Sequence, residues 1–146
     1  MLEAMQFVAV LSCTLFTGAA IYINLVEHPA RMGCGTELAI TEWAPSYKRA
    51  VGMQVPLAVV STVAGVVSWF MTNEMLWLFG ALLIFAVIPF TLIVIMLTNK
   101  ILLDPGTDRT SATTYALLEK WGTLHGGRSI LSLIASLIFL FLLLRS

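Results

Sequence analysis

The sequence predicts an all-α integral membrane protein that folds as a bundle of four transmembrane helices. Of its 146 residues, 59% are hydrophobic and only 11% are charged, and the mean hydropathy is +0.94. A soluble domain of this length needs far more polar surface. Four apolar segments are each long enough to cross a bilayer core, which takes about 20 helical residues. None of them alternates between polar and apolar residues, so membrane strands are excluded.

The four spans follow one another in a single domain that takes up the whole chain. The first covers 5–26; it is too long for the core of a secretory signal, and no Lys or Arg precedes it. The second covers 45–70 and the third 75–97, and membrane helices tolerate the prolines inside them as kinks. The fourth covers 129–144, and we expect its helix to begin earlier, near Thr110.

The links between the spans differ in length. The link at 72–74 is short enough for a tight hairpin. The links at 29–44 and 100–120 are long and lie together on the opposite side of the membrane, because successive spans alternate in direction. Asp108 or Thr110 is expected to cap the helix that follows the last link.

The charges exclude one class of partner and predict an orientation. Formal net charge is zero and no basic tract occurs, so no nucleic acid is expected to bind. Positive residues favour the cytoplasmic side of a membrane, which places the long links in the cytoplasm and both termini outside. The side with the long links carries Arg31, Lys48, Arg49, Lys100, Arg109, Lys120 and Arg128, whereas the other side carries only Arg145.

The two cysteines do not indicate a redox or metal motif. Cys13 lies inside an apolar run and Cys34 lies in a link, with no C-x-x-C spacing. Since one is at membrane depth and the other at its rim, we expect both to be free thiols.

Polar residues gather at one end of the predicted bundle. The end of the first span, the start of the second, the end of the third and the start of the fourth belong to the same membrane face. In the first and last helices these residues are four and then three positions apart, so they share one helical stripe. Ionisable groups near lipid are costly unless paired and are functional candidates. The candidates are Asn24, Glu27, His28, Arg31, Trp43, Tyr47, Asn99, Trp121, His125 and Arg128.

Two stretches resemble a known family. PFTLIVIMLTNKILL (89–103) and KWGTLHGGRS (120–129) resemble the anthrone oxygenase-like membrane protein family, long described as a domain of unknown function. NLVEHPARM (24–32) and EWAPSYKRA (42–50) fit the same pattern, so the resemblance covers nearly the whole chain. Its most specific part is Pro-aromatic-Thr, then T-N-K, then W-x-x-x-H-x-x-R. Proline often precedes T-N-K in the family, and Leu97 stands there in this chain.

The resemblance implies an activity and a set of site residues. It points to enzymes, fungal and bacterial, that oxidise anthrones to anthraquinones with molecular oxygen and without a conventional cofactor. The anthrone itself is not carried over, because one fold supports different chemistries. On this pattern the site residues are His28, Asn99, Trp121, His125 and Arg128.

The leading hypothesis is oxygen-dependent oxidation of a hydrophobic aromatic or phenolic substrate that arrives from the bilayer, with no cofactor required. His125 or His28 would act as the base, since imidazole is poised near neutral pH. Arg128, Arg31 and Asn99 would stabilise the developing oxyanion, and indole rings would form stacking walls. The substrate-binding residues on this hypothesis are Trp121, Trp43, Tyr47, Asn24 and Arg31.

The second hypothesis is a metal or haem site that holds Cu, Fe or haem. His28, His125 and Glu27 would supply two imidazoles and a carboxylate, which is the ligand set of non-haem iron oxygenases. Two histidines on separate helices could also ligate haem. The chain has no H-x-x-x-H or C-x-x-C-H spacing, so the sequence leaves this hypothesis open.

The third hypothesis is a non-enzymatic accessory subunit that binds lipid or quinone within a larger membrane complex or a homo-oligomer. Small residues in the spans would then form close helix contacts, and the polar end would face headgroups or a partner. On every hypothesis the protein is integral to a lipid bilayer, and we expect a bacterial inner membrane.

Overall fold

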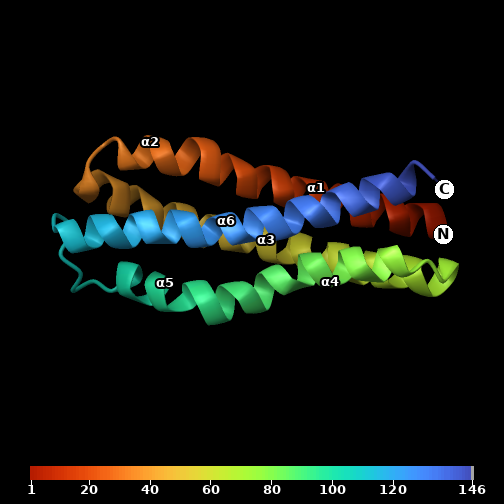
Figure 1. Cartoon of the computed structure of the whole chain (residues 1–146). Coiled ribbons are helices and arrows are strands. Elements are labelled where there is room, and N and C mark those ends of the chain that lie inside the picture. Colours follow the sequence, from red (N-terminus) through yellow and green to blue (C-terminus); the bar gives the residue numbers. More distant parts are fainter. Residues whose placement is uncertain (146) are drawn as a thin grey trace.

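The computed structural model describes residues 1–145, and 89% of the chain is helical, with no strand in the described part. Four helical rods run side by side in alternating directions (Figure 1). Each rod is long and apolar enough to cross a membrane, which is compatible with an integral multi-pass protein and confirms the predicted fold class. The elements are α1 (Leu2–Tyr22), η1 (Ile23–Glu27) and α2 (His28–Met32), then α3 (Thr36–Thr72), then α4 (Met75–Phe90), η2 (Thr91–Ile95) and α5 (Met96–Leu103), then α6 (Ala112–Leu143).

The rods form a closed bundle in which α1 and α4 each pack against both α3 and α6. The N-terminus and the end of α6 lie at the same end as the hairpin between α3 and α4 (Figure 1). The half nearer the termini has an apolar core that includes Phe16, Trp77 and Phe139. A second core, around Trp43 and Trp121, lies in the other half, where the sequence predicts the polar end.

The short link forms the tight hairpin that the sequence predicts. Asn73 adopts a left-handed conformation with φ of 56°, and its N–H donates to the carbonyl of Trp69 at 2.8 Å, which ends α3. The carboxylate of Glu74 accepts from the N–H of Leu76 and caps α4. Cys13 and Cys34 are free thiols, as predicted.

The link predicted at 29–44 is wrong in extent, because helix occupies most of it. α2 continues to Met32 and α3 begins at Thr36, so only residues 33–35 turn. Gly35 has a φ of 89°, which glycine adopts without a steric penalty. With 37 residues, α3 is about 55 Å long, well beyond the roughly 30 Å of a hydrocarbon core. The predicted second span, 45–70, therefore lies within a longer helix, most of whose additional residues come before the span, from Thr36.

The last link covers residues 104–111, and the predicted start of the final helix near Thr110 is confirmed by α6. The predicted cap is wrong, since Ser111 is the N-cap and its Oγ accepts from the N–H of Thr114 at 3.1 Å. Asp108 instead accepts from the backbone N–H and the hydroxyl of Thr110, both at 2.9 Å. These hydrogen bonds hold the pKa of Asp108 below its ordinary value. Its carboxylate thus stabilises the turn before the helix.

Two π turns, η1 and η2, interrupt the rods and were not predicted. η1 ends two residues before Pro29, whose ring has no N–H and clashes with the carbonyl four residues earlier, so a regular α turn cannot form there. η2 begins two residues after Pro89. A π turn holds an extra residue and occurs frequently at functional sites. Both π turns lie in the half of the bundle that carries the polar residues.

Gly80 of α4 lets the ring of Phe139 approach the helix backbone. A Cβ atom at Gly80 would lie 2.5 Å from Cε1 of Phe139, whose ring is fully buried and stacked on Trp77. We expect Gly80→Ala to lower the free energy of unfolding by about 1–3 kcal/mol, because the ring or the helix must shift. Thermal unfolding in detergent measures this loss.

Gly18→Ala is the matched control, because no atom lies within 4 Å of the position of its Cβ. Alanine favours a helix over glycine, so this variant should unfold at the same temperature or higher. Equal losses in the two variants would contradict the role of the close contact.

Candidate functional site

The predicted polar residues converge between the four rods in the half of the bundle away from the termini. Asn24, Glu27 and Tyr47 are partly exposed. The other predicted residues are buried, and they are His28, Arg31, Trp43, Asn99, Trp121, His125 and Arg128. Both predicted helical stripes therefore face the interior, where each polar atom needs a partner.

Asn24, in the π turn η1, binds three groups of α6. Its Nδ2 donates to the carbonyl oxygen of Gly122 at 2.8 Å. Its Oδ1 is then the acceptor, and it lies 2.7 Å from both Nδ1 of His125 and Oγ of Ser129. Since that oxygen only accepts, Nδ1 of the neutral imidazole carries the hydrogen and Nε2 keeps its lone pair. One amide thus sets the tautomer of His125.

The indole of Trp121 packs against both histidines. Its ring centre lies 4.9 Å from that of His125 and 5.2 Å from that of His28. Nε2 of His28 lies 2.9 Å from the carbonyl oxygen of Leu118, so this nitrogen is the donor. The other ring nitrogen, Nδ1, is buried without a partner in the described residues.

Asn99 joins this tryptophan to two more aromatic rings. Its Oδ1 accepts from Nε1 of Trp121 at 2.9 Å, and its Nδ2 donates to the phenol oxygen of Tyr47 at 3.1 Å. Trp43 stacks on Tyr47 at 5.1 Å and meets Trp121 edge-on at 5.6 Å. These contacts hold the rings in fixed orientations, and the hydroxyl hydrogen of Tyr47 is left free to donate elsewhere.

Arg31 is buried, but its charge is compensated. Its guanidinium forms an ion pair with Glu27, which also accepts from Oγ of Ser46. Its Nε lies 2.6 Å from a carboxylate oxygen of Glu42, as an ion pair without the alignment of a hydrogen bond. Two acids therefore surround this cation, and it is part of a closed network.

Arg128 is buried to a similar degree and has no such compensation. Its Nη2 donates to Oε1 of Gln54 at 2.8 Å, and its guanidinium lies 5.4 Å from the ring centre of Phe16. No carboxylate pairs with it anywhere in residues 1–145. Removing a cation from water is costly unless a negative group is near. The site therefore lacks one negative charge.

A small internal cavity of about 10 Å³ lies where these groups meet, with room for about one water-sized atom. The polar and aromatic side chains that line it are Arg31, Ser46, Tyr47, Gln54, Trp121, His125 and Arg128. Nδ1 of the histidine is already hydrogen-bonded, so Nε2 is the ring nitrogen available to accept a proton there.

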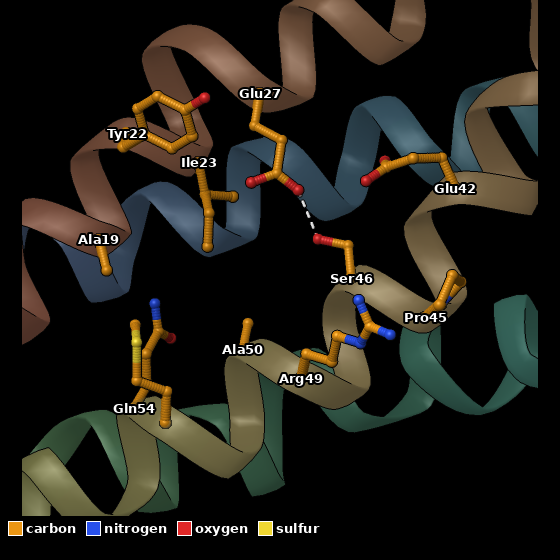
Figure 2. Close-up of a pocket in the computed structure, with 11 residues that line it drawn as sticks. Ala19, Tyr22, Ile23, Glu27, Glu42, Pro45, Ser46, Arg49, Ala50 and Gln54 are labelled. Carbon is orange, nitrogen blue, oxygen red and sulfur yellow. Dashed lines mark hydrogen bonds between the residues drawn. The ribbon is translucent and has the colours of Figure 1, made fainter.

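A larger cleft of about 570 Å³ opens between the first rod and α3. Figure 2 shows Glu27 and Glu42 toward one end of this cleft and Gln54 toward the other. An apolar crevice of about 100 Å³ between α3 and the third rod also reaches Tyr47 and Arg128. The residues that line both the cleft and the internal cavity are Ile23, Ser46, Ala50 and Gln54.

The residues of the metal hypothesis are not gathered into a ligand set. Within residues 1–145 no group of three or more His, Cys, Asp or Glu side chains could hold a metal ion. His28, His125 and Glu27 each have another partner: a backbone carbonyl, an amide and a guanidinium.

The sequence pattern of the anthrone oxygenase family matches residues 43–138, more than half of the chain. The chain belongs to the anthrone oxygenase family. The matched stretch holds Trp43, Asn99, Trp121, His125 and Arg128, whereas the first rod of this family member precedes it. Searches among curated proteins and among solved structures found no match.

Three residues at the site of this anthrone oxygenase family member were not predicted from the sequence. Gln54 accepts a hydrogen bond from Arg128. Ser129 donates to Asn24, and Ser46 donates to Glu27. The only signal for Gln54 is that it is a lone amide in an apolar span, and such a residue can face lipid or interior.

Gly122 leaves room for the ring of His28. A Cβ atom at Gly122 would lie 2.5 Å from Cδ2 and 2.6 Å from Nε2 of that ring. We expect Gly122→Ala to break the hydrogen bond from His28 to Leu118 and to lower the free energy of unfolding by about 1–3 kcal/mol. Thermal unfolding of the purified variant measures the loss.

Gly126→Ala, one turn later on α6, is the control. Its Cβ atom would meet only Nδ2 of Asn24, at an ordinary 3.9 Å. If this variant lost as much stability as Gly122→Ala, the packing of His28 against the helix would not be the cause.

Proposed function

We propose that the protein oxidises a hydrophobic aromatic or phenolic substrate with molecular oxygen. The observation that carries this proposal is the buried, uncompensated Arg128 beside His125 at an internal cavity. A substrate that becomes an anion there would supply the missing negative charge. Membership of the anthrone oxygenase family supports the same reaction class.

The cleft between the first rod and α3 suits a flat apolar substrate that arrives from the bilayer. Its volume, about 570 Å³, is in the range of small-molecule sites. The ring system would lie in this cleft, and its reacting edge would reach past Gln54 toward the internal cavity. Oxygen is apolar and dissolves in lipid, so the crevice between α3 and the third rod gives it a separate approach to Tyr47 and Arg128.

His125 would act as the base. Its Nε2 accepts a proton from the substrate, and the anion that remains is stabilised by Arg128 in a site with little water. The electron-rich anion then reduces oxygen, and a carbon–oxygen bond forms to give a hydroperoxide. When the second C–H proton leaves, the O–O bond breaks. A ring CH₂ thus becomes a carbonyl, and the other oxygen atom leaves as water.

The other residues of the site position the base, His125, and the groups around the cavity. Trp121 packs against the ring of His125 and is itself packed against His28, while Asn24 keeps Nε2 of His125 free of hydrogen. Asn99 and Trp43 fix the phenol of Tyr47 at the edge of the cavity. Arg31 lies in its own ion-pair network and would hold the first rod against α3 next to the cleft.

His125→Gln should lower kcat by about 100-fold or more, because a general base contributes this much. The measurement is oxygen consumption by purified protein with anthrone as the probe, because its central ring carries the CH₂ group that the proposed steps oxidise. His28→Gln is the matched comparison, and we expect a smaller loss, since this ring does not line the internal cavity. Full turnover by His125→Gln would remove this residue from the role of base.

Chelation is expected to leave turnover unchanged. The described residues form no three-ligand site for a metal, and the proposed steps need only a base and a cation. Oxygen consumption before and after dialysis against EDTA, with elemental analysis for Cu and Fe, checks this. Loss of activity that returns with one added metal would favour the metal hypothesis instead.

A further inference from the structure

Two side chains that line the internal cavity each have a buried N–H donor with neither a hydrogen bond nor an ion pair in the described part of the chain. The two donors are Nε2 of Gln54 and Nε of Arg128. Gln54 is 1% exposed and Arg128 is 6% exposed, so bulk water does not satisfy them. Native structures rarely leave buried donors unpaired, and two on contacting side chains indicate that a ligand supplies the acceptor.

The hydrogen bond from Arg128 determines which end of the Gln54 amide faces the guanidinium. Nη2 of Arg128 donates to this amide at 2.8 Å. A guanidinium has no acceptor, so the amide must present its oxygen to Arg128 and keep its N–H group for another partner. Gln54 therefore offers only a donor to a ligand.

The size and place of the cavity restrict what can bind. About 10 Å³ holds one water-sized atom, so one oxygen fits, whereas a carboxylate, sulfate or phosphate group does not. Gln54 lines both this cavity and the 570 Å³ cleft. A ligand in the cleft can thus place one oxygen at the two donors while its ring stays outside.

The charge of Arg128 selects among ligands with a single oxygen. A neutral ketone would leave the cation uncompensated, whereas an ionised oxygen would pair with it. His125 lines the same cavity, and its Nε2, which carries no hydrogen, can take the proton from an O–H group.

We infer that Gln54 and Arg128 form a binding site for one anionic oxygen atom, and that the ligand class is a phenol or enol bound as its anion. Gln54 is on this inference a specificity-determining residue for the oxidised substrate. The role of the bound anion as the oxidised substrate rests on the proposed function. Binding of the anion can be measured without turnover.

The experiment uses para-nitrophenol, whose ionised form is read by its absorbance, and the full-length protein in lipid nanodiscs. Wild-type protein should lower the apparent pKa of bound nitrophenol relative to empty nanodiscs. Gln54→Leu should raise this value by about one to two units, since it removes a hydrogen bond to a charged oxygen. An unchanged value in Gln54→Leu would overturn the inference.

Gln6→Leu is the matched control, because Gln6 is also buried, at 3% exposure, and lies at the opposite end of the bundle. This variant should leave the apparent pKa of bound nitrophenol at its wild-type value. A shift as large as that of Gln54→Leu would contradict the proposed site. Gln54→Glu tests the site independently if the leucine variant unfolds. The carboxylate of the variant would pair with Arg128, so binding of nitrophenolate should be lost. Retained binding would contradict the proposed site.

Nitrophenol has no ring CH₂ group to oxidise, so this readout does not depend on the proposed reaction. A shift that depends on Gln54, with no oxidation of any probe, would leave the binding site in place and remove the proposed function. Oxidation without such a shift would support the function and remove the binding site.

Discussion

The side-chain amide of Asn24 is the interaction on which the polar half of the bundle depends. It joins the first rod to α6 through Gly122, Ser129 and His125. In an apolar environment each unpaired polar group costs free energy, so these bonds hold the two helices in one register. The π turn that carries Asn24 and the ring orientation of His125 are parts of the same arrangement.

The two buried arginines differ in whether their charge is compensated. Arg31 lies between Glu27 and Glu42, and its field is largely cancelled within the network. Arg128 has a neutral amide and an aromatic ring instead, so its field extends into the cavity. The two arginines are buried to a similar degree, but only the charge of Arg31 is neutralised. The difference lies in the partners that surround each guanidinium, which are carboxylates for Arg31 and an amide for Arg128.

Hydropathy and helical spacing were enough to predict the four spans and the two polar stripes, because both depend on local order along the chain. They failed where packing decides. Gln54 could equally have faced lipid, and only the position of Arg128 on another helix orients it. The π turn before Pro29 breaks the regular period that sequence reasoning assumes. One of the two acids that pair with Arg31 is Glu42, which lies across a short turn where the sequence predicts a long link.

The length of α3 has a consequence for how affinity is measured. This helix is longer than the hydrocarbon core is thick, and the cleft lies along its first half, between Glu42 and Gln54, so we expect the cleft to open where acyl chains meet headgroups. Amphiphilic phenols accumulate in that layer, so the concentration that the cleft meets is set by partition rather than by the aqueous phase. Apparent KM values should therefore scale with the amount of lipid in the assay. KM values from different detergents or vesicles are comparable only when the substrate concentration is given as its mole fraction in the membrane.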